Sequence, residues 1–192
     1  MKQLNVFPEC YVDTNLVSYL LGANVKHKSS CNEVVKALNN SESFAVGIID
    51  ADKRMPTFDA GFAKHVPKAV PIGGGEHLTM FIHADGKRFL FTVNPAMDGF
   101  IMDAANECGI KLASYGFPAS LAEFKKITKR IQAADDSNLR RLFAGIDNSS
   151  EFQRFRNTLK YLTAKEYSAD VPIVKKFFDG ELTSAHLGQY LL

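Results

Sequence analysis

Residues 44–54 read Phe-Ala-Val-Gly-Ile-Ile-Asp-Ala-Asp-Lys-Arg, an apolar run that ends in two carboxylates and two cations. A short run rich in Val and Ile is typical of a strand that is buried on both faces of a parallel sheet. Ligands of open α/β sheets bind at the carboxyl ends of such strands, where Asp50 and Asp52 are expected. Because the two residues are two positions apart on an extended backbone, their side chains are predicted on the same side.

Two like charges held side by side are unfavourable unless a cation joins them or one of them is protonated. Carboxylate oxygens are also the hard ligands that Mg²⁺ prefers. The stretch therefore indicates a metal site, and a solvated loop that happens to contain Asp-x-Asp is the alternative. Lys53 and Arg54 follow directly, and they either hold a phosphate beside the metal or only offset local negative charge.

The 192-residue chain has the composition of an ordinary globular protein, with 46% hydrophobic and 23% charged residues. Its formal net charge of +2 does not indicate a strongly basic nucleic-acid binder, but it is compatible with a local basic groove. Three scattered cysteines favour a reducing compartment over a disulfide framework. The sequence shows no apolar stretch of signal or membrane-spanning length, so we expect a cytoplasmic protein without membrane association.

The chain before this stretch predicts a short strand, then two helices. The strand covers Leu4 to Phe7, the first helix starts with Asp13 or Thr14 as its N-cap, and the second runs from Cys31 to Asn39. Strand, helix, helix and strand in this order indicate βαβ crossovers and a largely parallel, Rossmann-like sheet. Glu9 then lies at the carboxyl end of the first strand.

After the Asp-x-Asp stretch, a short helix is predicted around Phe58–Lys64. Leu78–His83 and Arg88–Val93 flank Ala-Asp-Gly-Lys and predict a β-hairpin insertion. Ala96 to Cys108 predicts a helix that carries Asp98 in its first turn, where a carboxylate is favoured by the helix dipole. Residues 117–192 are predicted to form a helical extension packed on an α/β core of residues 1–116.

The extension carries many cations, among them Lys125, Lys129 and Arg156. Such residues either line a nucleic-acid groove or form the solvated face of amphipathic helices, and the solvated face is the commoner case.

The carboxylates named above are expected to converge, because the ends of parallel strands share one edge of the sheet. Glu9, Asp50, Asp52 and Asp98 then form a candidate Mg²⁺ or Mn²⁺ site, with Asp13 close by. The metal would neutralise phosphate charge and help to generate a hydroxide nucleophile, and Glu9 would be placed to move a proton.

Two segments carry a resemblance to a known family. Glu9-Cys10-Tyr11-Val12-Asp13 resembles the Glu-x-x-x-Asp opening of the Toprim (topoisomerase–primase) fold, and Ile48-Ile49-Asp50-Ala51-Asp52 resembles its second motif. The segment 94–100 is loosely similar to part of the stand-alone Toprim proteins related to the overcoming-lysogenization-defect nucleases. The resemblance covers about residues 4–105. Cys10 stands where the family usually has Gly, and Asp98 stands where the related nucleases have Glu.

The resemblance implies Mg²⁺-dependent cleavage of phosphodiesters, with Glu9 as acid/base and with Asp50 and Asp52 as metal ligands. Asp13 and Lys53 would assist catalysis, and Asp98 would join the metal ligands. Nucleic acid would be the substrate, in phage defence or DNA repair, and a protein such as an ATPase would be a partner. A non-catalytic α/β interaction module is the alternative of another class.

A second resemblance leads to another nuclease family. Residues 11–17 resemble the opening of PIN-domain ribonucleases, and residues 98–105 faintly resemble their late helix with an Asp. The sequence between these segments contains no matching acidic helix, and the Asp-x-Asp strand has no role in that pattern. A PIN-like ribonuclease is therefore the second hypothesis.

Overall fold

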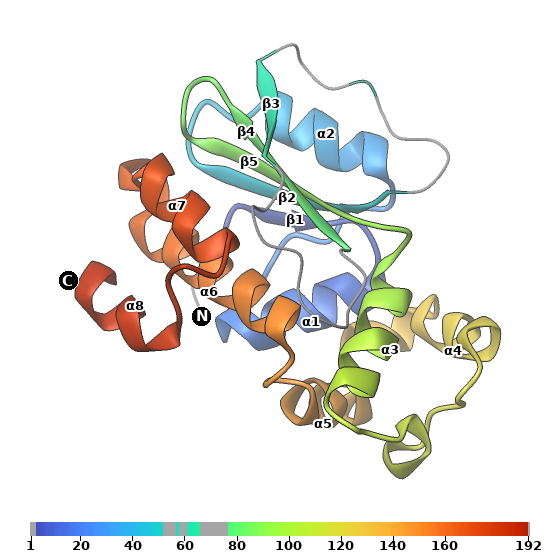
Figure 1. The fold of residues 1–192 in the computed structure, drawn as a ribbon. Helices are drawn as coiled ribbons and strands as arrows, with labels where there is room; N and C mark the ends of the chain where they lie inside the picture. The colour runs from blue at the N-terminus through green and yellow to red at the C-terminus, as the bar shows by residue number, and fades with distance from the viewer. Residues whose placement is uncertain (1–2, 52–56, 58–60, 66–76, 192) are drawn as a thin grey trace.

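A computed structural model of the chain describes residues 3–51, 57, 61–65 and 77–191. These residues form an open sheet with helices on both faces, which confirms the predicted α/β class (Figure 1). The described strands are β1 (Val6–Pro8), β2 (Ala45–Asp50), β3 (Phe62–His65), β4 (Leu78–His83) and β5 (Arg88–Val93).

The strand order in the sheet is β1-β2-β5-β4-β3. β1 pairs parallel with β2, and β2 pairs parallel with β5, whereas β4 is antiparallel to both β5 and β3. The predicted hairpin is present as β4 and β5, with Gly86 of its turn at a positive φ of 67°. It is not an insertion, however, because β5 is almost wholly buried and lies against β2 in the middle of the sheet.

One segment differs from its sequence prediction. A helix was expected around Phe58–Lys64, but Phe62–His65 is strand β3, and residues 58–60 lie outside the described residues. β3 pairs with β4 from Phe62 opposite His83 to His65 opposite Met80. Pairing at the edge of the sheet satisfies the backbone hydrogen-bonding groups of this short segment, so tertiary contacts override its local preference.

The described helices follow the apolar periodicity of the sequence. α1 begins at Tyr11, two residues before the predicted cap, because Cys10 is the N-cap and Asp13 accepts a hydrogen bond from its backbone N–H. Ser30 caps the second helix, where its hydroxyl oxygen accepts a hydrogen bond from the backbone N–H of Glu33. The bounds are α1 (Tyr11–Leu21), α2 (Cys31–Asn39), α3 (Met97–Glu107), α4 (Leu121–Thr128), α5 (Ser137–Gly145), α6 (Ser150–Lys165), α7 (Val171–Phe178) and α8 (Ser184–Leu191), with short 3₁₀ turns at Leu112–Tyr115, Ile131–Ala134 and Glu166–Ser168.

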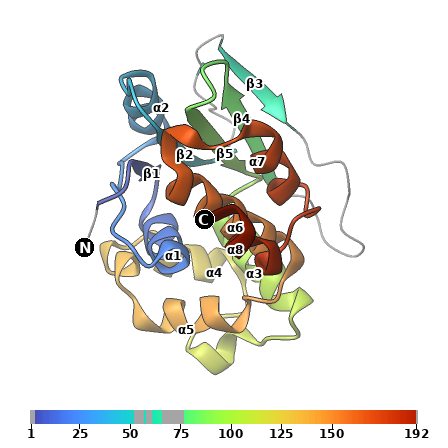
Figure 2. The ribbon, with the colours of Figure 1, turned by 90° about the vertical axis from the view of Figure 1, so that its left-hand side faces the viewer.

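The two faces of the sheet are covered unequally. α2 packs on one face, while α1, α3, α6 and α7 lie on the other, as Figures 1 and 2 show from two directions. α2 approaches β2 closely at Gly47, where an added Cβ would lie 2.7 Å from Leu38 Cδ1 and 2.8 Å from Val34 Cγ1. A glycine at this position therefore permits the close packing of helix on strand.

The helices after residue 117 share their core with the sheet. The ring of Phe91 on β5 lies 5.4 Å from that of Phe155 on α6 and 5.8 Å from that of Phe178 on α7. All three side chains are buried in one hydrophobic cluster that also contains residues of α1 and α3. Within the described ranges, no helix has both the length and the apolar character needed to cross a bilayer.

Candidate functional site: the carboxyl edge of the sheet

Glu9 and Asp50 lie side by side at the carboxyl ends of β1 and β2. The backbone N–H of Glu9 donates to the carbonyl of Ile48 at 3.1 Å, which continues the parallel pairing one residue beyond β1. The backbone N–H of Asp50 donates to Glu9 Oε2 at 3.1 Å. These two bonds place the Glu9 carboxylate directly beside the end of β2, as the parallel pairing predicted from the sequence requires.

The Asp50 side chain connects β2 to the start of α3. Its Oδ1 accepts a hydrogen bond from the backbone N–H of Met97, the first residue of α3, at 2.9 Å. The N-cap of that helix is Ala96, which has no side-chain acceptor, so Asp50 supplies the acceptor from another element. A carboxylate is favoured at this end of a helix by the dipole.

Several groups shift the protonation of Asp50. Burial raises its pKa to about 7, the Met97 N–H opposes the rise, and the charges of Glu9 and Asp98 add to it. Lys125 on α4 lowers the pKa of the same carboxyl. The described carboxylates are thus close enough for their charges to repel one another.

Asp13 lies beneath this edge in the first turn of α1. Its side chain is fully buried, and its Oδ2 accepts from the backbone N–H of Cys10 at 3.3 Å. Its Oδ1 is buried without a hydrogen-bond partner among the described residues. Burial raises the pKa of Asp13 well above its usual range, and the charges of Asp50 and Glu9 raise it further. A buried carboxyl oxygen without a partner is costly and calls for an explanation.

Cys10 lies between these carboxylates. Burial raises the pKa of its thiol, and the charges of Asp13 and Asp50 add to the rise. The thiol is therefore kept in its protonated form, which is a poor nucleophile. This arrangement agrees with the sequence, in which Cys10 has no local signature of a nucleophile.

Asp98 approaches the site from the first turn of α3. It is buried, and it accepts a short hydrogen bond from the hydroxyl of Thr128 at the end of α4. Its charge contributes to the raised pKa of Asp50, so it belongs to the same group of carboxylates. The structure therefore brings together Glu9, Asp13, Asp50 and Asp98.

The remaining predicted site residues, Asp52 and Lys53, lie outside the described residues. Among the residues that the structure describes, no group of three or more His, Cys, Asp or Glu side chains is arranged to hold a metal ion. The four described carboxylates form an acidic cluster. The backbone N–H groups of Met97, Cys10 and Asp50 donate to Asp50, Asp13 and Glu9 respectively, and the Thr128 hydroxyl donates to Asp98.

A histidine lies farther along the same edge of the sheet. His77 precedes β4 and contacts Glu151 with Nδ1 at 3.0 Å and Asp103 with Nε2 at 3.1 Å. Glu151 also accepts from the backbone N–H groups of His77 and Leu78 at 2.8 and 2.7 Å. The Glu151 hydrogen bond is the largest cause that raises the pKa of His77, and burial opposes it.

Sequence reasoning missed several members of this edge. The sequence places Thr128 and Lys125 in a cation-rich amphipathic helix, and nothing in that pattern relates them to the acidic residues. Glu151 and His77 are 74 residues apart in the chain, and no local pattern relates them.

Comparison with known proteins gives no relative for this chain. No family model matches it, and neither a curated protein nor a solved structure does so.

Proposed function

We propose that the protein is a metal-dependent nuclease of the Toprim type, which cleaves phosphodiester bonds at the acidic cluster. The observation that carries this proposal is the contact between Glu9 and the end of β2, with Asp13 buried behind it and one of its oxygens without a partner among the described residues. The sequence resemblance assigns Glu9 and Asp13 to the first Toprim motif and Asp50 to the second.

The donor chemistry of the cluster fits Mg²⁺ or Mn²⁺. Every carboxylate in it offers hard oxygen ligands. Burial raises the pKa values of Asp13 and Asp50, and the charges of neighbouring carboxylates add to the rise. Glu9, Asp50 and Asp98 would hold the ion together with Asp52. When bound, the ion would neutralise phosphate charge and lower the pKa of a bound water.

The residues of the chain would divide the remaining work. Glu9 would accept or donate the proton, since it lies at the strand end with one oxygen already held by the Asp50 N–H. Asp13 fixes the start of α1 through Cys10 and so holds Glu9 in place. Lys125 would contact the phosphate beside Asp50, and Lys53 would do so from the segment that follows.

The partners follow from this chemistry. A nucleic acid is the proposed substrate, and the cations of α4, Lys125 and Lys126, would contact its backbone. The resemblance adds the proposal that the protein acts in the cytoplasm beside a partner such as an ATPase, in phage defence or DNA repair.

A cleavage assay tests the proposal. Supercoiled plasmid and a structured RNA are incubated with the protein and Mg²⁺ or Mn²⁺. The double variant Asp50→Asn, Asp52→Asn is run alongside, because Asn keeps the acceptor for the Met97 N–H and removes the charges. Glu42→Ala, Asp135→Ala removes two exposed carboxylates elsewhere and serves as the matched control.

Metal-dependent cleavage that is lost in the Asp50, Asp52 variant and kept in the control supports the proposal. Cleavage of RNA alone would favour the PIN-like hypothesis. Absence of cleavage, or equal cleavage by the folded variant, would favour the non-catalytic interaction module.

A further inference from the structure

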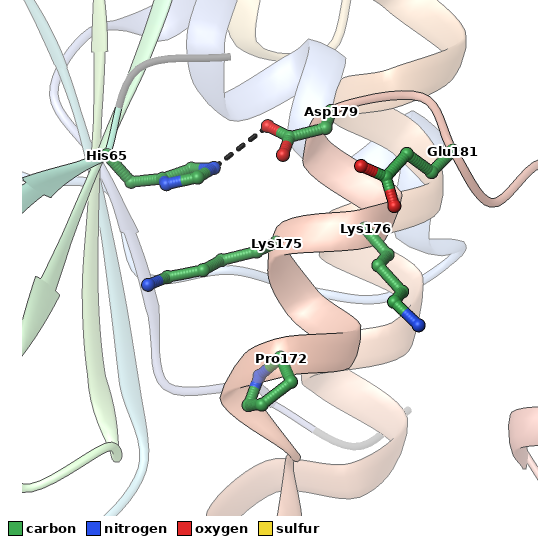
Figure 3. A pocket seen from close by; sticks show the side chains of 6 residues that line it. All are labelled: His65, Pro172, Lys175, Lys176, Asp179 and Glu181. Atoms are coloured by element: carbon green, nitrogen blue, oxygen red, sulfur yellow. Dashed lines mark hydrogen bonds and ion pairs between the residues drawn. The ribbon is translucent and has the colours of Figure 1, made fainter. Parts of the chain in front are cut away.

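A cavity separate from the acidic cluster lies between the end of β3 and α7. Its volume is about 470 Å³, which is within the range of small-molecule sites. Three kinds of side chain line it, namely a histidine, two lysines and two carboxylates, together with one proline (Figure 3): His65, Pro172, Lys175, Lys176, Asp179 and Glu181.

The strand directions place this cavity at the same edge of the sheet as the acidic cluster. β3 is antiparallel to β4, which is antiparallel to β5, so β3 runs in the same direction as β2 and β5. His65 ends β3 as Asp50 ends β2. Three strand spacings separate β2 from β3, or roughly 14 Å, so the cavity and the acidic cluster are distinct sites.

The histidine in this cavity is held by a buried carboxylate. His65 Nε2 lies 2.8 Å from Asp179 Oδ1, and the Asp179 side chain is only 3% exposed. Because a carboxylate accepts and does not donate, Nε2 carries the hydrogen. The ring also lies 6.0 Å from that of Phe178, which restricts its rotation. Asp179 thereby fixes both the orientation and the tautomer of His65.

The second ring nitrogen is then the reactive one. Nδ1 of His65 has no hydrogen-bond partner in the described part of the chain, and in Figure 3 it lies on the edge of the ring turned toward Lys175. Lys175 and Lys176 are both exposed and carry no ion pair to a described residue. Figure 3 shows Lys175 extending below His65, whereas Lys176 and Glu181 lie on the other side of the cavity.

We propose that this cavity binds a small molecule that carries a phosphate monoester, held between His65 and Lys175. A phosphate monoester exchanges its second proton near neutral pH. Its monoanion can donate that proton to a neutral Nδ1, and its dianion can accept a hydrogen from a protonated ring. A carboxylate has no proton to donate near neutral pH, and therefore matches only the protonated ring.

The electrostatics of the cavity favour this position for the phosphate. Asp179 accepts the Nε2 hydrogen of His65, and a protonated ring would compensate its charge where the anion would bind. Lys175 adds a cation on the same side, and Glu181 lies away from it. This proposal does not depend on cleavage at the acidic cluster, because none of its residues belongs to that cluster.

A titration followed by two-dimensional ¹H–¹⁵N NMR tests the proposal with inorganic phosphate and with AMP as probes at constant ionic strength. We expect saturable shifts at His65 and in α7, and tighter binding of phosphate than of sulfate. Lys175→Met should weaken binding about five- to tenfold. Lys36→Met, an exposed lysine on α2, is the matched control and should bind as the wild type does.

Equal binding by the Lys175 and Lys36 variants, or shifts that chloride reproduces, would overturn the proposal. Binding of AMP with perturbed residues at Glu9 and Asp50 instead would assign the phosphate to the acidic cluster and would also overturn it.

Discussion

The two ends of one sheet edge hold their carboxylates in different ways. Near β1 and β2, Asp13 accepts a hydrogen bond from the backbone N–H of Cys10 and Asp50 accepts one from that of Met97, and both carboxyls have raised pKa values. Near β3 and β4, Asp179 and Glu151 are each paired with a histidine.

The Glu151 pair has an architectural use, whereas the acids near β1 and β2 and the Asp179–His65 pair are those proposed to act on ligands. A paired acid and histidine satisfy each other, and the pair at Glu151 also ties the start of α6 to the start of β4. Crowded acids with raised pKa values weaken the fold unless a proton or a cation joins them. The hydrogen-bond and charge partners of an acid therefore say more about its role than the number of acids at the edge does.

The largest loss of stability is expected near β3 and β4, the compensated end of the edge, where the acids are paired with histidines. Glu151→Ala removes the acceptor of two backbone N–H groups and the partner of His77, and Arg154 Nη2 at 3.9 Å also loses its neighbouring charge. Because these groups are buried, the free energy of unfolding should fall by about 3 kcal/mol or more. Urea unfolding measures this change.

An exposed acid provides the control for that loss. Glu123 pairs with Lys126 at the surface of α4, where both side chains are more than half exposed. Glu123→Ala should change the free energy of unfolding by less than about 1 kcal/mol. A similar loss of stability in both variants would mean that the buried partners of Glu151 contribute no more to stability than an exposed ion pair does.

The second prediction concerns added metal at the crowded end. At a Mg²⁺ concentration ten times the dissociation constant, the wild type should gain about 1.4 kcal/mol of stability. Thermal unfolding with MgCl₂, compared with NaCl of equal ionic strength, measures the gain. Asp50→Asn, Asp52→Asn should lose it, and an equal gain in this variant would locate the metal elsewhere.

The third prediction removes one charge from the crowded end without metal. The pKa of Asp50 is raised from 3.8 to about 7 in the folded state, so its ionised form opposes folding increasingly as the pH rises through that window. Asp50→Asn should therefore raise the free energy of unfolding by about 1 kcal/mol at pH 8 in EDTA, and not at pH 4. Urea unfolding at both pH values measures this change, and a loss of stability at pH 8 would contradict the raised pKa of Asp50.

The smallest effect is the pH dependence of the compensated end. The raised pKa of His77 means that its contribution to stability is complete below pH 6.5 and is lost as the pH rises through the folded-state value. Glu151→Gln keeps an acceptor for the two N–H groups but removes the charge, so it should reduce this loss. Unfolding midpoints at pH 6 and pH 8.5 measure it, and an unchanged difference between the two midpoints would exclude Glu151 as its cause.

Features that depend on nearby residues could be predicted from the sequence. The apolar run predicted β2, and the parallel pairing of β1 and β2 then placed Glu9 beside Asp50. The hairpin was also predicted, since Asp-Gly between two alternating segments is a local signal.

Features that depend on distant residues could not be predicted. β5 lies between β2 and β4. Hydrophobic periodicity predicts that a segment is a strand, but it does not predict which strands lie beside it. The contact of Thr128 with Asp98 spans 30 residues and depends on how α4 packs on α3. β3 is a strand only because β4 is beside it, which explains why its own residues suggested a helix.

The order of strands has a consequence for synthesis of the chain. β2 has its parallel partner β1 within the first 50 residues, but its other neighbour, β5, ends only at Val93. While the ribosome adds the residues between them, one edge of β2 has no strand to pair with, and its backbone hydrogen-bonding groups on that side are unpaired. The nascent chain should therefore bind chaperones most strongly in this interval, and release them once the hairpin has emerged.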